Sequence, residues 1–265
     1  MNRMKILRYT YILYIVAMMT ACSRGVEGVT WTTETLCDTL LTGKDKGMMC
    51  WTSASLTLLT ADTLSPYYAH TERINRFIID ELMDGCQGAA STKAAQQFVA
   101  ESNRSMAEEM LTLYGANGGD LAPVFSNRLT TEAHWGYDDE VVCYTMDIDS
   151  YTGGAHPVAL RHTRCFSLRS GEVVKPEDVF RWEMEDSLVC RLTRRLMEMT
   201  GLNSMEELRE SGYLDVSDMF VTSNMLLEQD AIVFHYNPYE LAPYALGDID
   251  IRLTYDEVKD LLIEN

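Results

Sequence analysis

The sequence predicts an α+β fold in which helices pack on an antiparallel sheet, either as one domain or as two small, closely packed subdomains. Apolar residues recur at helical spacing between residues 65 and 113, and the pattern changes to strict alternation between residues 124 and 168. Predicted helices and strands are therefore grouped along the chain, which is typical of α+β proteins. A hydrophobic content of 46% is enough to build the core of such a fold.

The first regular elements are a strand and a helix. Thr and Ser alternate with Ala and Leu over 50–59, which predicts a strand. Ser65 and Pro66 open a helix, because proline is favoured at the first helical position. The apolar residues of this helix are Ile74, Phe77, Ile78 and Leu82.

A second helix is expected from Ser91, a suitable N-cap, to the breaker Asn117-Gly118-Gly119. We interpret its methionines as core residues. Its apolar stripe consists of Phe98, Val99, Met106, Met110 and Leu113.

The middle of the chain predicts three consecutive antiparallel strands, over 124–133, 140–148 and 158–168. A helix follows over 184–199 and ends at Gly201. The remaining elements are strands at 225–227, 232–236 and 249–254 and a last helix over 255–263.

The N-terminus predicts a lipoprotein signal peptide over residues 1–21. A basic start precedes an apolar run from Tyr9 to Thr20, which is too short for a permanent membrane span. The quartet Met19–Cys22 resembles a bacterial lipobox, in which Cys22 receives lipid after cleavage. We therefore expect a protein of the cell envelope, anchored in the outer membrane and facing the periplasm, with residues 22–48 as a flexible tether.

The chain is strongly acidic. Its formal charge is −18, and loss of the basic residues Arg3, Lys5 and Arg8 with the signal peptide changes this to −21. Phosphates would repel such a protein, so nucleic acid is excluded as a partner, and attachment to the membrane falls to the lipid on Cys22. An acidic surface also favours encounters with basic proteins.

Six cysteines remain besides Cys22, and an envelope location permits disulfides between them. Cys143 and Cys165 lie on the strands that flank the segment SYTGGAHP (150–157), so they either pair or pack as small apolar groups. No CxxC pair occurs, which argues against a zinc knuckle or a thioredoxin-like redox site.

The segment SYTGGAHP has the composition of a sharp turn. Gly153 and Gly154 can adopt positive φ, and Pro157 fixes φ where the next strand begins. His156 is not needed for the turn, so it either locks the loop through backbone groups or contacts a ligand.

Three segments together resemble one known family: 150–157, then 165–174 with 176–180, then 234–247. They resemble the DUF3298 family, first known from the outer domain of RsiV, a lysozyme-sensing anti-sigma factor, and also found beside PdaC-type polysaccharide deacetylases. The resemblance assigns 120–265 to this C-terminal domain. Residues 49–119 look like its companion N-terminal domain, DUF4163.

The resemblance implies an extracytoplasmic domain that binds and does not catalyse, with a lysozyme-like protein or an envelope glycan as ligand. The chain has a lipobox where RsiV has a transmembrane helix and a sigma-binding segment, so we do not expect an anti-sigma role. No deacetylase region is present, so that activity is not transferred.

The third segment contains a loop, 237–247, with two prolines, two tyrosines and one glutamate. Stiff aromatic loops suit recognition, because little conformational entropy is left to lose on binding. Alternatively, Tyr239 and Tyr244 cap the sheet and Glu240 bonds nearby backbone. If the loop lies near SYTGGAHP, the ligand-binding residues are Tyr151, His156, Tyr239, Glu240 and Tyr244.

Catalytic patterns are missing from the sequence: it has no GxSxG, SxxK, HExxH or P-loop motif. Asp147 and Asp149 share a strand face, as do Asp248 and Asp250, so either pair could bind calcium or act as acid and base, or simply line a solvated edge. We expect no enzyme, cofactor or metal. The alternative is a glycan hydrolase that uses Glu240 or Asp147 and Asp149 with His156.

Overall fold

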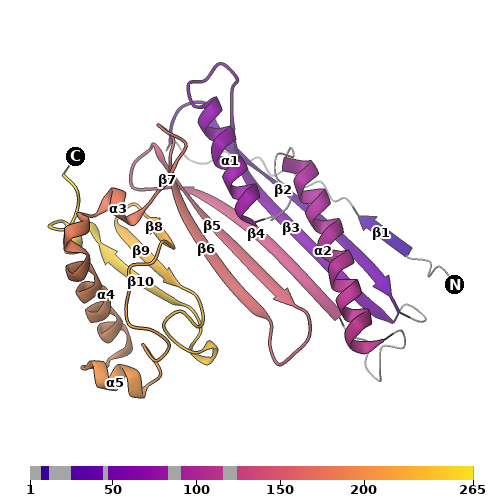
Figure 1. Ribbon diagram of the computed structural model, residues 1–265. Coiled ribbons are helices and arrows are strands. Elements are labelled where there is room, and N and C mark those ends of the chain that lie inside the picture. Colours follow the sequence, from indigo (N-terminus) through magenta and orange to yellow (C-terminus); the bar gives the residue numbers. More distant parts are fainter. Residues whose placement is uncertain (1–6, 12–24, 44–46, 83–90, 116–123, 265) are drawn as a thin grey trace. The chain divides into compact units, whose positions relative to one another are not determined.

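A computed structural model describes residues 7–11, 25–43, 47–82, 91–115 and 124–264 (Figure 1). It confirms the α+β class. The described strands form a seven-stranded sheet with mainly antiparallel pairing, in the order β1 to β7, and a three-stranded sheet in the order β10-β9-β8. Several helices accompany the sheets.

The chain divides into two compact units. The first contains β1, Gly28–Glu132 and Met146–Ala159, and the second contains Ala133–Thr145 and 160–264 with the short segment 25–27. Strands β4, β5 and β6 contribute residues to both units.

In the first unit β2 pairs with β3 along its whole length in antiparallel register. Strand β3 pairs with β4 in parallel, although the sequence predicts antiparallel strands, because helices α1 and α2 lie between them and carry the chain back. This unit holds β1 (Leu7–Tyr11), β2 (Val29–Thr42), β3 (Met48–Ala61), α1 (Tyr68–Leu82), α2 (Ser91–Tyr114) and most of β4 (Val124–Trp135).

Strand β2 lies where the sequence predicts a flexible tether. Its residues hydrogen-bond to β3 through their side chains as well as through the backbone. The Thr33 and Thr57 hydroxyls lie 2.8 Å apart, and those of Thr35 and Ser55 lie 3.0 Å apart. Rows of threonine favour a strand when a partner strand presents matching hydroxyls, which a single segment does not reveal.

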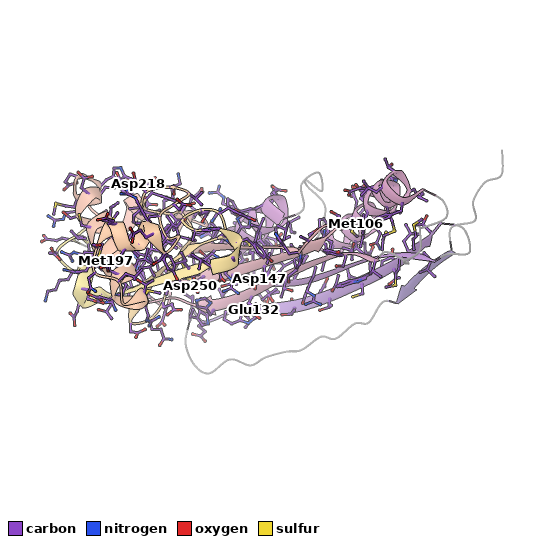
Figure 2. All side chains as sticks on the ribbon, turned by 90° about the horizontal axis from the view of Figure 1, so that it is seen from below. Met106, Glu132, Asp147, Met197, Asp218 and Asp250 are labelled. Atoms are coloured by element: carbon purple, nitrogen blue, oxygen red, sulfur yellow. A yellow bond between two sulfur atoms is a disulfide. The ribbon has the colours of Figure 1, made fainter. Side chains whose placement is uncertain are left out.

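Helices α1 and α2 cover one face of the strands in this unit (Figure 2). On α2, Met106 and Met110 are buried against Cys50 of β3 and Phe125 of β4, so the predicted role of the methionines is confirmed. Leu113 departs from the predicted stripe, because 60% of its surface is exposed.

The second unit has its core between α4 and the three-stranded sheet. Leu188, Leu192 and Leu196 of α4 are buried, and Gly201 ends this helix with φ +72°, as predicted. The remaining elements are β5 (Val141–Tyr151), β6 (Val158–Ser167), β7 (Val173–Val174), α3 (Pro176–Val179), α4 (Glu185–Thr200), α5 (Met205–Glu210), β8 (Met225–Leu227), β9 (Ala231–Tyr236), β10 (Ile249–Thr254) and α6 (Tyr255–Val258).

Helix α6 is shorter than the sequence predicts. Its start is well capped, because Thr254 and Glu257 form a capping box. The residues after Val258 bond elsewhere: the Arg181 backbone N–H donates to the Leu261 carbonyl, and the Ile263 N–H donates to the Val179 carbonyl. This pairing competes with continuation of the helix.

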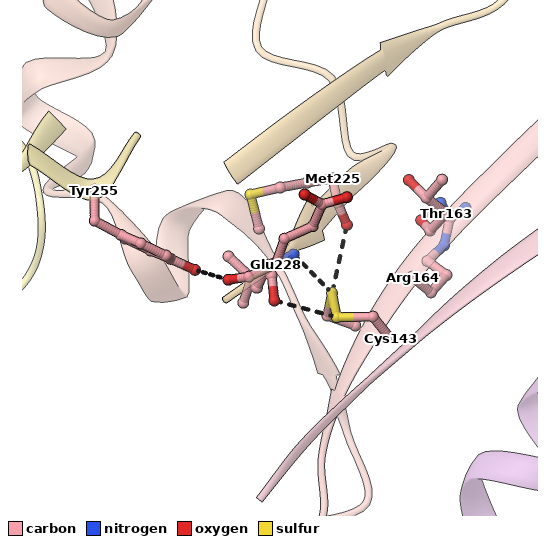
Figure 3. Close-up of a disulfide and its surroundings, with 8 residues drawn as sticks. Cys143, Thr163, Arg164, Met225, Glu228 and Tyr255 are labelled. Carbon is pink, nitrogen blue, oxygen red and sulfur yellow. Dashed lines mark hydrogen bonds between the residues drawn. A yellow bond between two sulfur atoms is a disulfide. The ribbon is translucent and has the colours of Figure 1, made fainter. Parts of the chain in front are cut away.

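The structure joins Cys143 and Cys165 in a disulfide, with their Cα atoms 4.1 Å apart (Figure 3). Both cysteines are fully buried in the second unit, near Met225. Among the described cysteines, Cys37 and Cys190 are exposed free thiols. Cys50 is a buried thiol, and its burial raises its pKa to about 11.

Several predictions fall outside the described residues. They concern Cys22, most of the predicted signal peptide, the breaker at 117–119 and the boundary between 119 and 120. Among the residues that are described, no helix is both long and apolar enough to span a membrane.

Candidate functional site in the loop between β9 and β10

The loop Asn237–Gly247 joins β9 to β10 within the second unit, and buried side chains anchor it to the core of this unit. Leu241 and Ala242 are buried in the core of this unit. Tyr236, the last residue of β9, is also buried and donates its hydroxyl to the Phe220 carbonyl at 2.6 Å. The loop is therefore held in place by side chains that pack in the core.

Hydrogen bonds fix the shape of the loop. The Glu240 carboxylate accepts from the Asn237 backbone N–H at 2.8 Å, and the Tyr239 N–H donates to the Ala242 carbonyl at 2.8 Å. Ser217 donates to the Glu240 carbonyl at 2.6 Å from a neighbouring segment. Glu240 thus has the backbone-bonding role that the sequence analysis gave as the alternative to ligand contact.

Tyr239 is the most unusual residue of the loop. Its φ is +71°, and 57% of its surface is exposed. Its ring centroid lies 6.1 Å from that of Tyr244, and the two ring planes make an angle of 31°. Positive φ is costly for a residue with a side chain, so this position favours glycine, yet it holds an exposed aromatic ring.

The surface beside the loop is apolar and acidic. Val216 and Phe220 are exposed on the segment 215–220, which Ser217 links to the loop, and Leu246 of the loop itself is also exposed. Asp218 on this segment is exposed and pairs with Arg209 at 2.7 Å (Figure 2).

A buried histidine lies at the base of the loop. His235 on β9 is opposite Asp250 on β10, and its Nδ1 is 2.7 Å from the Asp250 carboxylate and 4.0 Å from that of Asp248. The hydrogen bond with His235 lowers the pKa of Asp250. On the other side of the ring, Nε2 lies 3.4 Å from the Asn237 side-chain oxygen.

Asp248 and Asp250 were predictable as a carboxylate pair from the sequence, whereas no role was predicted for His235. The signal that could have found it is the pairing of β9 with β10, which sets His235 opposite Asp250. The intervening loop is long, so its length does not fix that register.

The other two predicted ligand residues, Tyr151 and His156, belong to the first unit. Tyr151 donates its hydroxyl to the Gly154 carbonyl at 3.2 Å, and His156 Nδ1 donates to the Pro157 carbonyl at 2.9 Å. Both bonds stay within SYTGGAHP, where Gly153 and Gly154 have the predicted positive φ. The loop residues Tyr239, Glu240 and Tyr244 belong to the second unit, so the five-residue patch stays a prediction.

Asp147 and Asp149, the carboxylates of the alternative catalytic prediction, lie on β5 in the first unit. Asp147 is half-buried and Asp149 is exposed. Glu240 belongs to the second unit. Their predicted role as an acid and base with His156 remains a prediction.

Comparison with known proteins identifies part of the chain. Residues 177–256 match the model of a family described as "Protein of unknown function (DUF3298)". The match includes β9, the loop 237–247 and β10, so the expected resemblance is confirmed for this part. No curated protein matches the chain.

Two solved structures have the same fold. A DUF3298 family member from Bacteroides fragilis superposes with a TM-score of 0.78 at 19% identity, covering 89% of this chain and 94% of that one. A DUF3298 family protein from Pseudomonas aeruginosa PAO1 superposes with a TM-score of 0.59 at 15% identity, covering 87% of this chain and 94% of that one. At these identities the likeness concerns the fold alone.

Proposed function

We propose that the protein is a lipid-anchored binding module of the cell envelope, held in the outer membrane through Cys22 and facing the periplasm. One observation carries the proposal: Tyr239 keeps an exposed ring on a backbone conformation that favours glycine. Strain of this kind persists where the surrounding structure enforces it, and it gathers at ligand-binding positions. Because the surrounding structure fixes the position of the Tyr239 backbone before a ligand binds, little conformational entropy is lost on binding.

The ligand we propose is a basic protein of the lysozyme type. A formal charge of −18 attracts a basic partner over a long range. The exposed Phe220, whose ring packs on Tyr236, and the exposed Leu246 of the same loop as Tyr239 add apolar area of the kind that a protein interface needs. The resemblance to the RsiV outer domain leads to the same class of ligand. An envelope glycan is the other outcome that the test below resolves.

The proposed module does not catalyse. Glu240, the acid of the alternative hydrolase, holds the loop by accepting from the Asn237 backbone N–H. Tyr151 and His156, which belong to the first unit, are proposed as separate contacts with the ligand. The same experiment therefore measures both binding and turnover.

The test immobilises the full-length protein and measures the equilibrium affinity for a purified lysozyme and, separately, for soluble peptidoglycan fragments. We expect saturable binding of lysozyme and no release of cleaved glycan. Tyr239→Gly and Tyr244→Ala should each weaken lysozyme binding at least tenfold, because aromatic residues dominate binding energy at interfaces.

Tyr137→Ala is the matched control. Tyr137 is an exposed tyrosine of the same unit, and its ring lies 5.7 Å from that of Tyr255 outside the loop. It should leave the affinity unchanged. Binding of glycan alone would replace the proposed ligand, and glycan cleavage that stops in Glu240→Gln would replace the binding module by a hydrolase.

A further inference from the structure

The orientation of the Asn237 side chain places a hydrogen-bond acceptor beside Nε2 of His235. Asn237 Oδ1 accepts from the Arg161 backbone N–H at 2.7 Å, and its Nδ2 donates to the Arg161 carbonyl at 2.9 Å. Exchanging the amide oxygen and nitrogen would place donor against donor and acceptor against acceptor, so the amide has one orientation. It presents Oδ1 to His235 Nε2 at 3.4 Å, so a hydrogen on Nε2 has an acceptor there.

With hydrogen on Nε2, the neutral ring directs the lone pair of Nδ1 at carboxylates. Nδ1 lies 2.7 Å from the Asp250 carboxylate, and both atoms are then acceptors. A positively charged species has to lie between them. It is either a second proton on the ring or a metal ion.

The surroundings suit a metal ion. The ligand atoms of His235, Asp248 and Asp250 all lie within 4.8 Å of one another. The ring is 2% exposed, whereas the Asp248 and Asp250 side chains are 56% and 50% exposed, so an ion can enter from solvent and meet a fixed nitrogen. Asn237 supplies the outer hydrogen bond that commonly orients a metal-binding histidine.

We infer that His235, Asp248 and Asp250 form a binding site for a divalent transition-metal ion such as manganese or zinc. Imidazole nitrogen with carboxylate oxygen is a ligand set of these ions, and calcium takes oxygen alone. His235 precedes the loop 237–247 and Asp248 follows it, so the ion joins the two ends of the loop. The sequence analysis assigned no metal site, and this site does not depend on the proposed partner.

The test uses the full-length protein in detergent, stripped of metal with a chelator. Mn²⁺ is the probe, since the exposed free thiols Cys37 and Cys190 would compete for zinc. The electron paramagnetic resonance signal of free Mn²⁺ counts the bound ions. We expect one site that is clearly tighter than the weak binding to the acidic surface.

Asp248→Asn and Asp250→Asn should each weaken this site at least tenfold, and Asp218→Asn, an exposed carboxylate of the same unit, should leave it unchanged. In the wild type, substoichiometric Mn²⁺ should broaden the His235 ring signals in the NMR spectrum before those of other histidines. If Asp250→Asn fails to fold, Asp248→Asn and the NMR experiment still decide. An unchanged affinity in Asp248→Asn, or unbroadened His235 signals, would overturn the inference and leave only the hydrogen bond between His235 and Asp250.

Discussion

At Tyr239 the backbone conformation lowers the stability of the fold, whereas the exposed ring serves the proposed ligand binding. A left-handed backbone costs a residue with a side chain roughly 1–2 kcal/mol relative to glycine, and glycine loses part of this advantage through its freedom in the unfolded chain. Tyr239 has φ +71°, and its exposed ring makes few contacts that offset the cost apart from Tyr244.

Tyr239→Gly should therefore raise the free energy of unfolding, by about 1 kcal/mol. Urea denaturation at equilibrium measures this. Tyr239→Ala is the control, because alanine keeps the strain and should give no increase. A Tyr239→Gly protein less stable than the wild type would show that the ring supports the fold.

Glu240 allows a second residue-scale prediction. Its carboxylate accepts from the backbone N–H of Asn237, a residue that is 7% exposed. Glu240→Ala leaves this N–H without its partner and should lower the free energy of unfolding by about 1–2 kcal/mol. Glu240→Gln keeps an acceptor oxygen and should cost less than half as much. Equal losses in the two variants would contradict the role given to the carboxylate.

At the scale of elements, the disulfide ties β5 to β6 within the second unit. Cys143 and Cys165 are separated by 22 residues. Closing a loop of that length restricts the unfolded chain and stabilises the fold by about 3 kcal/mol. Reduction should therefore lower the urea midpoint of the full-length protein. Cys190→Ala, which removes an exposed free thiol, should leave both the oxidised and the reduced midpoint in place.

Helix α4 and the C-terminal segment 254–260 contribute to the acid sensitivity of the second unit. Hydrogen bonds from the Thr254 backbone lower the pKa of Glu257 below its ordinary 4.5, and a hydrogen bond from Arg191 lowers that of Asp260 below 3.8. The unfolded chain thus binds these protons first as the pH falls. The two carboxylates therefore make their full contribution to the free energy of unfolding above their ordinary pKa values. This contribution is lost as the pH falls through their lowered pKa values in the folded protein.

We expect the urea midpoint to be constant between pH 7 and pH 6 and to fall as the pH drops below about 4. Glu257→Gln should flatten this decline, because glutamine does not titrate. A decline of unchanged slope in Glu257→Gln would assign the acid sensitivity to other carboxylates.

Elements with strong local periodicity were predictable from the sequence. Helix α4 has its buried leucines at helical spacing, and β10 alternates buried and exposed residues along its length. Strand β2 was not predictable, since its threonines are stabilised by hydroxyls of β3 such as that of Thr57. Such pairing depends on a partner that lies outside the segment.

The same distinction applies to the candidate site. The stiffness of the loop 237–247 and the two possible roles of Glu240 followed from residue types alone. The positive φ of Tyr239 and the pairing of His235 with Asp250 did not, because they depend on how the loop closes and on the register of β9 with β10. Sequence thus indicates which loop matters, and packing decides how its residues meet.

At the scale of the whole molecule, charge governs the proposed encounter. The protein has a formal charge of −18 and therefore attracts a basic protein over a distance. Dissolved salt screens this attraction and shortens the distance over which it acts. The association rate constant with lysozyme should fall at least tenfold between low salt and 0.5 M salt. The dissociation rate constant should change much less, because the contacts of Tyr239 and Phe220 are apolar.

The central claim is that the loop 237–247 is where the protein meets its partner. The most direct measurement places a photo-activated benzoyl-phenylalanine at position 239 and, in a second protein, at position 137. After illumination with lysozyme, we predict a covalent complex from position 239 and none from position 137. Crosslinking from position 137 alone would contradict the claim.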